Sequence, residues 1–78
     1  MEYSTGIDLH KKFLRMTTLD RDGNVVKRAR VSNEPERIAR YFADLSGEHR
    51  AVFESCIGWY WLRDLLESLS IEVVMPIR

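Results

Sequence analysis

The fold is decided by the stretch FLRMTTLDRDGNVVKRARV, which occupies residues 13–31. Its centre, DRDGN at residues 20–24, places an Asp-Gly pair between two β-like runs. Asp-Gly at such a place is a strong hairpin signal, because glycine tolerates the positive φ that tight turns need. Residues 13–19 and 25–31 should therefore pair as antiparallel strands.

A third strand is expected before this hairpin. Residues 3–9 alternate between Tyr3, Thr5, Ile7 and Leu9 on one side and smaller or polar residues on the other. A period of two is typical of a strand. The first third of the chain is thus predicted to be a three-stranded antiparallel meander.

A helix should follow the hairpin. Asn33 and Glu36 have the spacing of a capping box, and Pro35 suits the first helical turn, where its missing N–H costs nothing. Gly47 is expected to end this helix. The spacing i, i+3, i+4, i+7 predicts one apolar face, made of Ile38, Tyr41, Phe42 and Leu45.

Strand and helix alternate in the rest of the chain. Residues 51–53 form a short apolar run that ends at Glu54, as in a buried parallel strand. Residues 71–74 supply a last strand, before Pro76. Between them lies a second helical stripe, made of Leu62, Leu65, Leu66 and Leu69.

The predicted order is β-β-β-α-β-α-β, which indicates an α/β fold. Helical crossovers should make the fourth and fifth strands parallel to the first, in a mixed five-stranded sheet of order 3-2-1-4-5. This order resembles the opening of the RNase H-like (RuvC-like) fold. With 78 residues, the chain is expected to be a single domain with a modest core.

Composition narrows the class of protein. Twelve basic residues balance twelve acidic ones, which argues against tight, nonspecific binding of nucleic acid but leaves room for a local basic face. Apolar runs are too short to span a membrane, and no signal peptide is apparent. Cys56 is the only cysteine, so a reducing cytoplasm is expected. We favour a packing role for Cys56 over a reactive thiol.

Two carboxylates are candidate metal ligands. Asp8 lies at the end of the first predicted strand and Glu54 at the end of the fourth, and sites in open α/β sheets form at such carboxyl ends. Carboxylates suit Mg²⁺, and paired ions about 3.5–4 Å apart support phosphodiester transfer. The alternative is that Asp8 merely ends a strand and Glu54 caps the second helix.

Several strings resemble one family. GIDLHK at residues 6–11, DRDG at 20–23 and ESCIGWYW at 54–61 are similar, in order and spacing, to segments of the DEDD transposases, the Piv-like insertion-sequence family. Cys56 stands where this family usually has Thr, and residues 75–76 read Met-Pro where Asn-Pro is commoner.

The resemblance implies a nuclease domain that cuts and joins DNA at a site of four carboxylates, Asp-Glu-Asp-Asp, with Mg²⁺ or Mn²⁺ as cofactor. Asp8 and Glu54 would be its first two catalytic metal ligands, and residues 1–78 a single truncated RNase H-like domain, weak in metal binding and inactive by itself. Insertion-sequence ends and target DNA would be its partners, and some family members also use a guide RNA.

Two other classes of function stay open. The chain could be a non-catalytic module that binds nucleic acid or protein, or a small protein that forms homo-oligomers through an exposed edge of its sheet. No membrane partner is expected.

Other side chains have two interpretations each. His10, Lys11 and Lys12 either contact DNA phosphate or form a solvated strand end. Lys27, Arg28 and Arg30, with Arg37 and Arg40 near them, form a basic ribbon, and we favour protection of an edge strand as its role. The aromatic residues 59–61 either stack on unpaired bases or pack against the sheet.

Overall fold

The computed structural model describes residues 2–54 and 60–74. Over these residues, five strands form one sheet of order β3-β2-β1-β4-β5, as the sequence predicts. The elements in chain order are β1 (Glu2–Leu9), β2 (Phe13–Leu19), β3 (Val25–Ser32), α1 (Pro35–Ala43), β4 (Glu48–Phe53), α2 (Tyr60–Ser68) and β5 (Glu72–Val74).

The β2–β3 hairpin is confirmed. Its turn is organised by Asp20, whose Oδ1 accepts hydrogen bonds from the backbone N–H groups of Asp22 at 2.9 Å and Asn24 at 3.0 Å. Gly23 adopts a φ of 87°, a left-handed conformation that glycine adopts without steric cost. The register shifts between Thr18 and Leu19, so one residue of β3 is left without a partner at this point.

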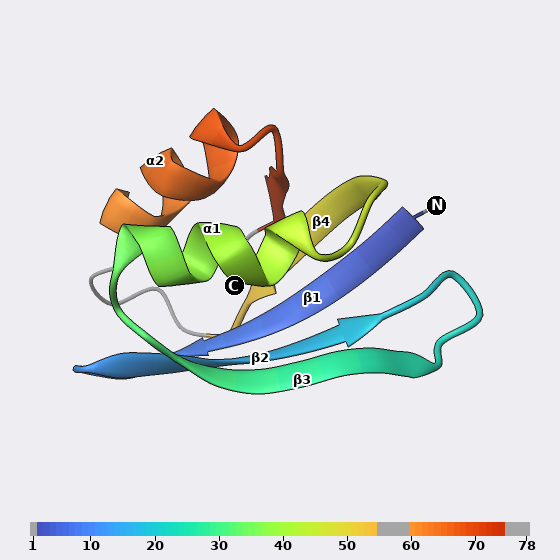
Figure 1. Cartoon of the computed structure of the whole chain (residues 1–78), viewed down its shortest axis with the longest axis horizontal. Coiled ribbons are helices and arrows are strands. Elements are labelled where there is room, and N and C mark those ends of the chain that lie inside the picture. The colour runs from blue at the N-terminus through green and yellow to red at the C-terminus, as the bar shows by residue number, and fades with distance from the viewer. Residues whose placement is uncertain (1, 55–59, 75–78) are drawn as a thin grey trace.

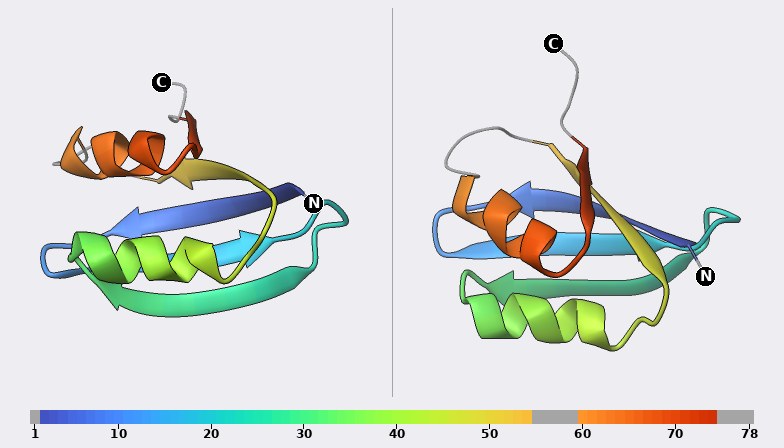
Figure 2. Two further views of the ribbon diagram at one scale, coloured as in Figure 1. Left: turned by 45° about the horizontal axis from the view of Figure 1, so that its top comes forward. Right: turned by 90° about the horizontal axis from the view of Figure 1, so that it is seen from above.

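Strand direction explains why both helices lie on one face of the sheet. β1 pairs antiparallel with β2 and parallel with β4, and β4 pairs parallel with β5. The connections β3–α1–β4 and β4–α2–β5 therefore join parallel strands and advance in the same direction across the sheet. Since such crossovers are right-handed, both helices fall on the same side (Figures 1 and 2). We call the other side the open face.

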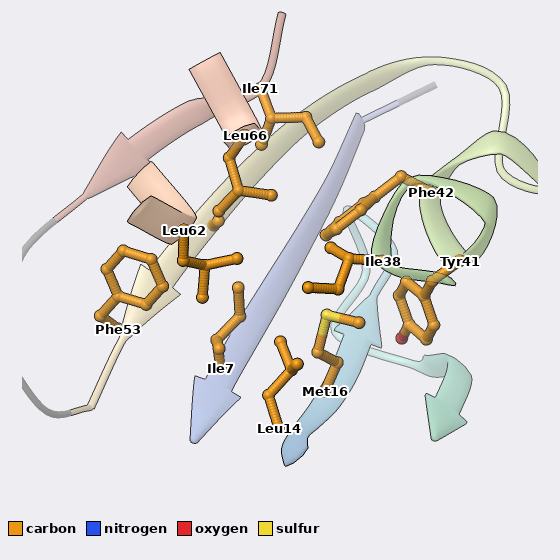
Figure 3. Packing of buried hydrophobic residues seen from close by; sticks show 11 residues of the cluster. Ile7, Leu14, Met16, Ile38, Tyr41, Phe42, Phe53, Leu62, Leu66 and Ile71 are labelled. Carbon is orange, nitrogen blue, oxygen red and sulfur yellow. The ribbon is translucent and has the colours of Figure 1, made fainter. Parts of the chain in front are cut away.

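The core lies between the sheet and the two helices. Alternate residues of the strands point toward the helices, and Figure 3 shows them meeting side chains from α1 and α2. Burying this apolar surface is the main driving force for folding. The buried hydrophobic residues are Ile7, Leu14, Met16, Ile38, Tyr41, Phe42, Ala51, Phe53, Leu62, Leu66 and Ile71.

A chain of hydroxyl groups crosses this core. Thr5 and Thr18 are both fully buried, and their Oγ1 atoms lie 2.7 Å apart. Oγ1 of Thr18 also lies 2.7 Å from the hydroxyl oxygen of Tyr41, which donates to the carbonyl of Lys27 at 3.3 Å. The chain links β1, β2, β3 and α1, and it satisfies polar groups that would otherwise cost free energy to bury.

The start of α1 differs from the prediction. The N-cap is Glu34, which makes no side-chain capping bond, so the expected capping box of Asn33 with Glu36 is wrong. The side chain of Asn33 instead donates to backbone carbonyls of the β1–β2 turn, and this competing use removes it from the helix. Pro35 does occupy the first turn, as expected.

The helix ends also differ. α1 ends at Ala43 with Asp44 as its C-cap, so Gly47 does not end the helix and Leu45 lies beyond it. In α2, Leu62 and Leu66 are buried, while Leu69 lies past the helix and is exposed. Within residues 2–54 and 60–74, neither helix is long and apolar enough to cross a lipid bilayer.

Replacing Tyr41 with phenylalanine tests the hydroxyl chain. Burial raises the pKa of the Tyr41 hydroxyl above its ordinary value of 10.0, and the hydrogen bond with Thr18 offsets part of the rise. The folded state thus holds this proton more tightly than the unfolded state, so its contribution to stability is complete below pH 10.0 and is lost as pH rises through the folded pKa.

We expect Tyr41→Phe to lower the free energy of unfolding by about 1 kcal/mol at neutral pH, the usual net value of one hydrogen bond. Urea denaturation of both proteins across a pH series measures the difference. It should shrink above pH 10.0. A difference that stayed constant across the series would show that Tyr41 titrates alike in the folded and unfolded states.

Candidate metal and nucleic-acid site

Asp8 and Glu54 lie side by side at the carboxyl ends of two central strands. β1 and β4 are parallel neighbours, with Ile7 opposite Phe53 in the register. The N–H of Glu54 donates to the carbonyl of Ile7 at 3.1 Å, so the ladder continues one residue past β4. Asp8 and Glu54 therefore occupy the next position of the same register, at the same end of the sheet.

Both carboxylates are on the open face. Ile7 and Phe53 are buried under the helices, so the residues that follow them point the opposite way. Oε2 of Glu54 lies 3.9 Å from the place where a β-carbon on Gly6 would stand, and Gly6 shares its face of β1 with Asp8. The side chain of Asp8 is 44% exposed and Glu54 is exposed, so solvent and ligands can reach both.

His10 contacts Asp8. Its Nε2 donates to Oδ2 of Asp8 at 3.0 Å, while its ring stacks on Phe13 with centroids 4.6 Å apart and an interplanar angle of 16°. The imidazole thus has an aromatic contact on one face and a hydrogen bond at its edge. His10 is therefore placed to orient the Asp8 carboxylate.

The turn that carries Lys11 and Lys12 is tied down by Asn33. Nδ2 of Asn33 donates to the carbonyls of His10 at 3.0 Å and Lys11 at 3.1 Å, and its backbone N–H donates to the carbonyl of Lys12 at 3.2 Å. Both lysine side chains are exposed. The turn thus has a fixed backbone and presents two cations beside the carboxyl end of β1.

A metal at this place would rest on few protein ligands. Among residues 2–54 and 60–74, no group of three or more His, Cys, Asp and Glu side chains is arranged to hold a metal ion. Two accessible carboxylates nonetheless supply the hard oxygen donors that Mg²⁺ prefers, and Mg²⁺ usually keeps several waters. Asp8 and Glu54 provide two such oxygen-donor side chains at one end of the sheet.

A hollow of about 370 Å³ lies at the opposite end of the sheet, and neither Asp8 nor Glu54 lines it. It contains the register pair Glu2 and Glu48, which stand at the amino ends of the same two strands. Carboxylates thus pair at both ends of β1 and β4, on the same face.

The sequence did not single out Phe13 as part of this region. The guanidinium carbon of Arg30 lies 3.9 Å from the centroid of the Phe13 ring. The guanidinium carbon of Arg15 lies 5.9 Å from the same centroid. β2 and β3 place Arg15 directly opposite Arg30. The signal available in the sequence was the period of two, which puts Phe13 and Arg15 on one face of β2.

The basic ribbon and the aromatic residues 59–61 are the remaining candidates from the sequence. β3, with Lys27, Arg28 and Arg30, is an edge strand of the sheet, as expected. Tyr60 is 62% exposed and Trp61 39% exposed on the first turn of α2, so neither packs fully against the sheet. Trp59 and Cys56 lie outside the described residues.

Comparison of the sequence with models of known protein families finds no match, and comparison with curated proteins finds none either. Membership of the DEDD transposases is therefore a prediction that rests on the strings at residues 6–11, 20–23 and 54–61.

Asn33→Ala tests whether Asn33 fixes the turn. The change removes two side-chain hydrogen bonds and should lower the free energy of unfolding by roughly 1–2 kcal/mol. Hydrogen exchange at the amides of Lys11 and Lys12 should become faster. Asn24→Ala in the hairpin turn is the matched control. Equal exchange rates at residues 11 and 12 in Asn33→Ala and wild type would show that the turn is stable without this side chain.

Proposed function

We propose that this chain is the N-terminal part of an RNase H-like nuclease domain of the DEDD transposase type, in which Asp8 and Glu54 hold a Mg²⁺ or Mn²⁺ ion for phosphodiester transfer on DNA. The observation that carries the proposal is the placement of Asp8 and Glu54 at one register position of two adjacent parallel strands. Strand-end carboxylates in an open α/β sheet are where such sites form.

In this proposal each neighbouring side chain has a role. Asp8 and Glu54 bind the ion through carboxylate oxygens, and His10 positions Asp8 through its hydrogen bond at 3.0 Å. Lys11 and Lys12 contact a DNA phosphate from the turn that Asn33 fixes. Acidic metal ligands with lysines beside them suit a substrate that is a polyanion, such as DNA.

The reaction would be displacement at phosphorus. An oxygen of water or of a DNA hydroxyl forms a bond to phosphorus while the bond to the leaving oxygen breaks. A divalent ion held by Asp8 and Glu54 would supply stabilisation of the negative charge that develops on these oxygens. Asp8 and Glu54 are half of the four-carboxylate site that the resemblance implies. We therefore propose weak metal binding and no DNA cleavage by residues 1–78 alone.

Titration with Mn²⁺ tests the metal site. This paramagnetic ion broadens NMR signals of nearby amides, so broadening should centre on residues 8 and 54 and should be reversed by excess Mg²⁺. The double variant Asp8→Asn/Glu54→Gln should lose it, because the amides are poor ligands for hard cations.

The register supplies a matched control. Glu2→Gln/Glu48→Gln removes the same charge from the other end of the same strands and should leave broadening at residues 8 and 54 unchanged. Broadening that is equally strong at Glu2 and Glu48, or absent from residues 8 and 54, would contradict a metal site at the carboxyl end.

A second candidate is a non-catalytic module that dimerises through a sheet edge, and the edge strand β5 favours it. Over its described residues, β5 pairs only with β4, and Val73 and Val74 are half-buried. β3, the other edge, carries a row of cations that would repel those of a second copy.

Light scattering distinguishes this candidate. A dimer mass that persists at high salt, together with no response to Mn²⁺, would support the interaction module over the nuclease. A monomer mass would remove it.

A further inference from the structure

The charges of this chain are separated in space, although they cancel in sum. Residues 11–43 contain nine of the twelve basic residues and four of the twelve acidic ones, whereas residues 44–74 contain two basic and six acidic residues. The first segment forms β2, β3 and α1, and the second forms β4, α2 and β5. One side of the molecule is therefore basic, and Figure 2 shows α1 lying beside β3 on that side.

A groove runs between β3 and α1 on this basic side. Its volume is about 290 Å³. Four of its lining residues are cations and one is an acid, while the others are apolar or neutral. The lining residues with charge are Lys27, Arg30, Arg37, Arg40 and Asp44.

The single acid of the groove is already neutralised. Nζ of Lys27 lies 3.1 Å from Oδ2 of Asp44 and also donates to the carbonyl of Tyr41 at 2.7 Å. Lys27 therefore serves to join β3 to the end of α1. The net positive charge that faces solvent comes from the three arginines.

These arginines have donors to spare. Arg40 makes no ion pair with any residue in 2–54 or 60–74. Arg37 pairs with Glu34 at 3.5 Å, with both side chains more than 60% exposed, so solvent screens the pair. The guanidinium carbon of Arg30 lies 3.9 Å from the centroid of the Phe13 ring, a cation–π contact that uses none of its N–H donors.

Protection of an edge strand does not account for this arrangement by itself. Such protection requires charges on the strand, and Arg30 would supply one. Arg37 and Arg40 belong to α1, yet they line the same groove. Within the described residues β3 pairs only with β2, so outward N–H groups of its backbone add further donors along the groove.

We propose that this groove binds the phosphodiester backbone of a nucleic acid, with Arg30, Arg37 and Arg40 as its phosphate contacts. Forked guanidinium groups on α1 and on the neighbouring edge strand β3 suit a row of phosphates that passes along this edge of the sheet. The groove ends at Ser32, which pairs with Phe13 next to the turn of Lys11 and Lys12. A backbone in the groove would thus lead toward the carboxyl end of β1.

The groove would be the surface on which the proposed nuclease holds its substrate, and in that sense its role rests on the proposed function. The binding itself needs neither Asp8 nor Glu54. DNA and RNA share the backbone chemistry, so duplex DNA, single-stranded DNA and RNA of one sequence are separate arms of the test.

The experiment is fluorescence anisotropy of labelled short strands with the 78-residue chain, in EDTA, over a salt series. Binding should weaken steeply with salt. Arg37→Gln/Arg40→Gln should reduce affinity by about tenfold or more at low salt and reduce the slope of log affinity against log salt by roughly 2 for duplex DNA. Arg37→Lys/Arg40→Lys keeps the charge and should keep most of the salt slope, and circular dichroism checks that each variant is folded.

Arg50→Gln/Arg63→Gln is the matched control, because it removes two arginines from the acidic half. It should bind nearly as wild type does. Equal weakening by the Arg37/Arg40 and Arg50/Arg63 variants, or no salt-dependent binding by wild type in any arm, would overturn the groove.

The two proposals can fail separately. Asp8→Asn/Glu54→Gln should bind nucleic acid at least as tightly as wild type, because it removes two negative charges, while losing the Mn²⁺ response. Intact groove binding without any metal response overturns the nuclease alone, and a metal response without groove binding overturns the groove alone.

Discussion

The parallel pairing of β1 with β4 is the constraint on which the rest of the structure depends. It places Ile7 opposite Phe53, and the bond from the N–H of Glu54 to the carbonyl of Ile7 extends the ladder at 3.1 Å. Because side chains alternate, burying Ile7 and Phe53 under the helices forces the next residue of each strand onto the open face. A slip of one residue would bury two carboxylates, so the hydrophobic core itself fixes the position of Asp8 and Glu54.

The same topology separates the charges. Both crossovers advance in one direction, so the helices share a face and α1 lies beside β3 at the edge of the sheet. Basic residues cluster in the segment that forms β2, β3 and α1, and the fold keeps that segment together. The chain has no net charge, yet one side of the molecule is basic because the fold groups these residues together.

Much of this fold was predictable, because its signals are local and agree with one another. The Asp-Gly turn at residues 22–23 and the stripe through Ile38, Tyr41 and Phe42 each specify an element, and handedness then fixes the sheet order. The register of the hairpin was not predictable. Counting back from the turn without the shift at Thr18 and Leu19 would place Arg15 opposite Ala29 instead of Arg30.

The cap of α1 was missed for a related reason. Asn33 has the residue type and the spacing of an N-cap, but the side chain has a choice of partners that only the tertiary structure decides. Here the carbonyls of His10 and Lys11 come within 3.0 and 3.1 Å of its Nδ2. They belong to residues more than twenty positions earlier in the chain, so no local pattern could reveal them.

The candidate site was predicted as two acids, and the structure adds the surroundings that distinguish them from another acidic pair. Glu2 and Glu48 share a register position of the same strands, on the same face. Among the described residues that line their hollow are four acids, with Asp20 and Glu72 as the other two, and two arginines, Arg21 and Arg50. A phosphate chain would be repelled from that end.

Asp8, in contrast, accepts a hydrogen bond from His10 at 3.0 Å, and the turn with Lys11 and Lys12 comes directly after its strand. Under the proposed function, the cations of this turn would attract a polyanion to the end of the sheet that carries Asp8 and Glu54.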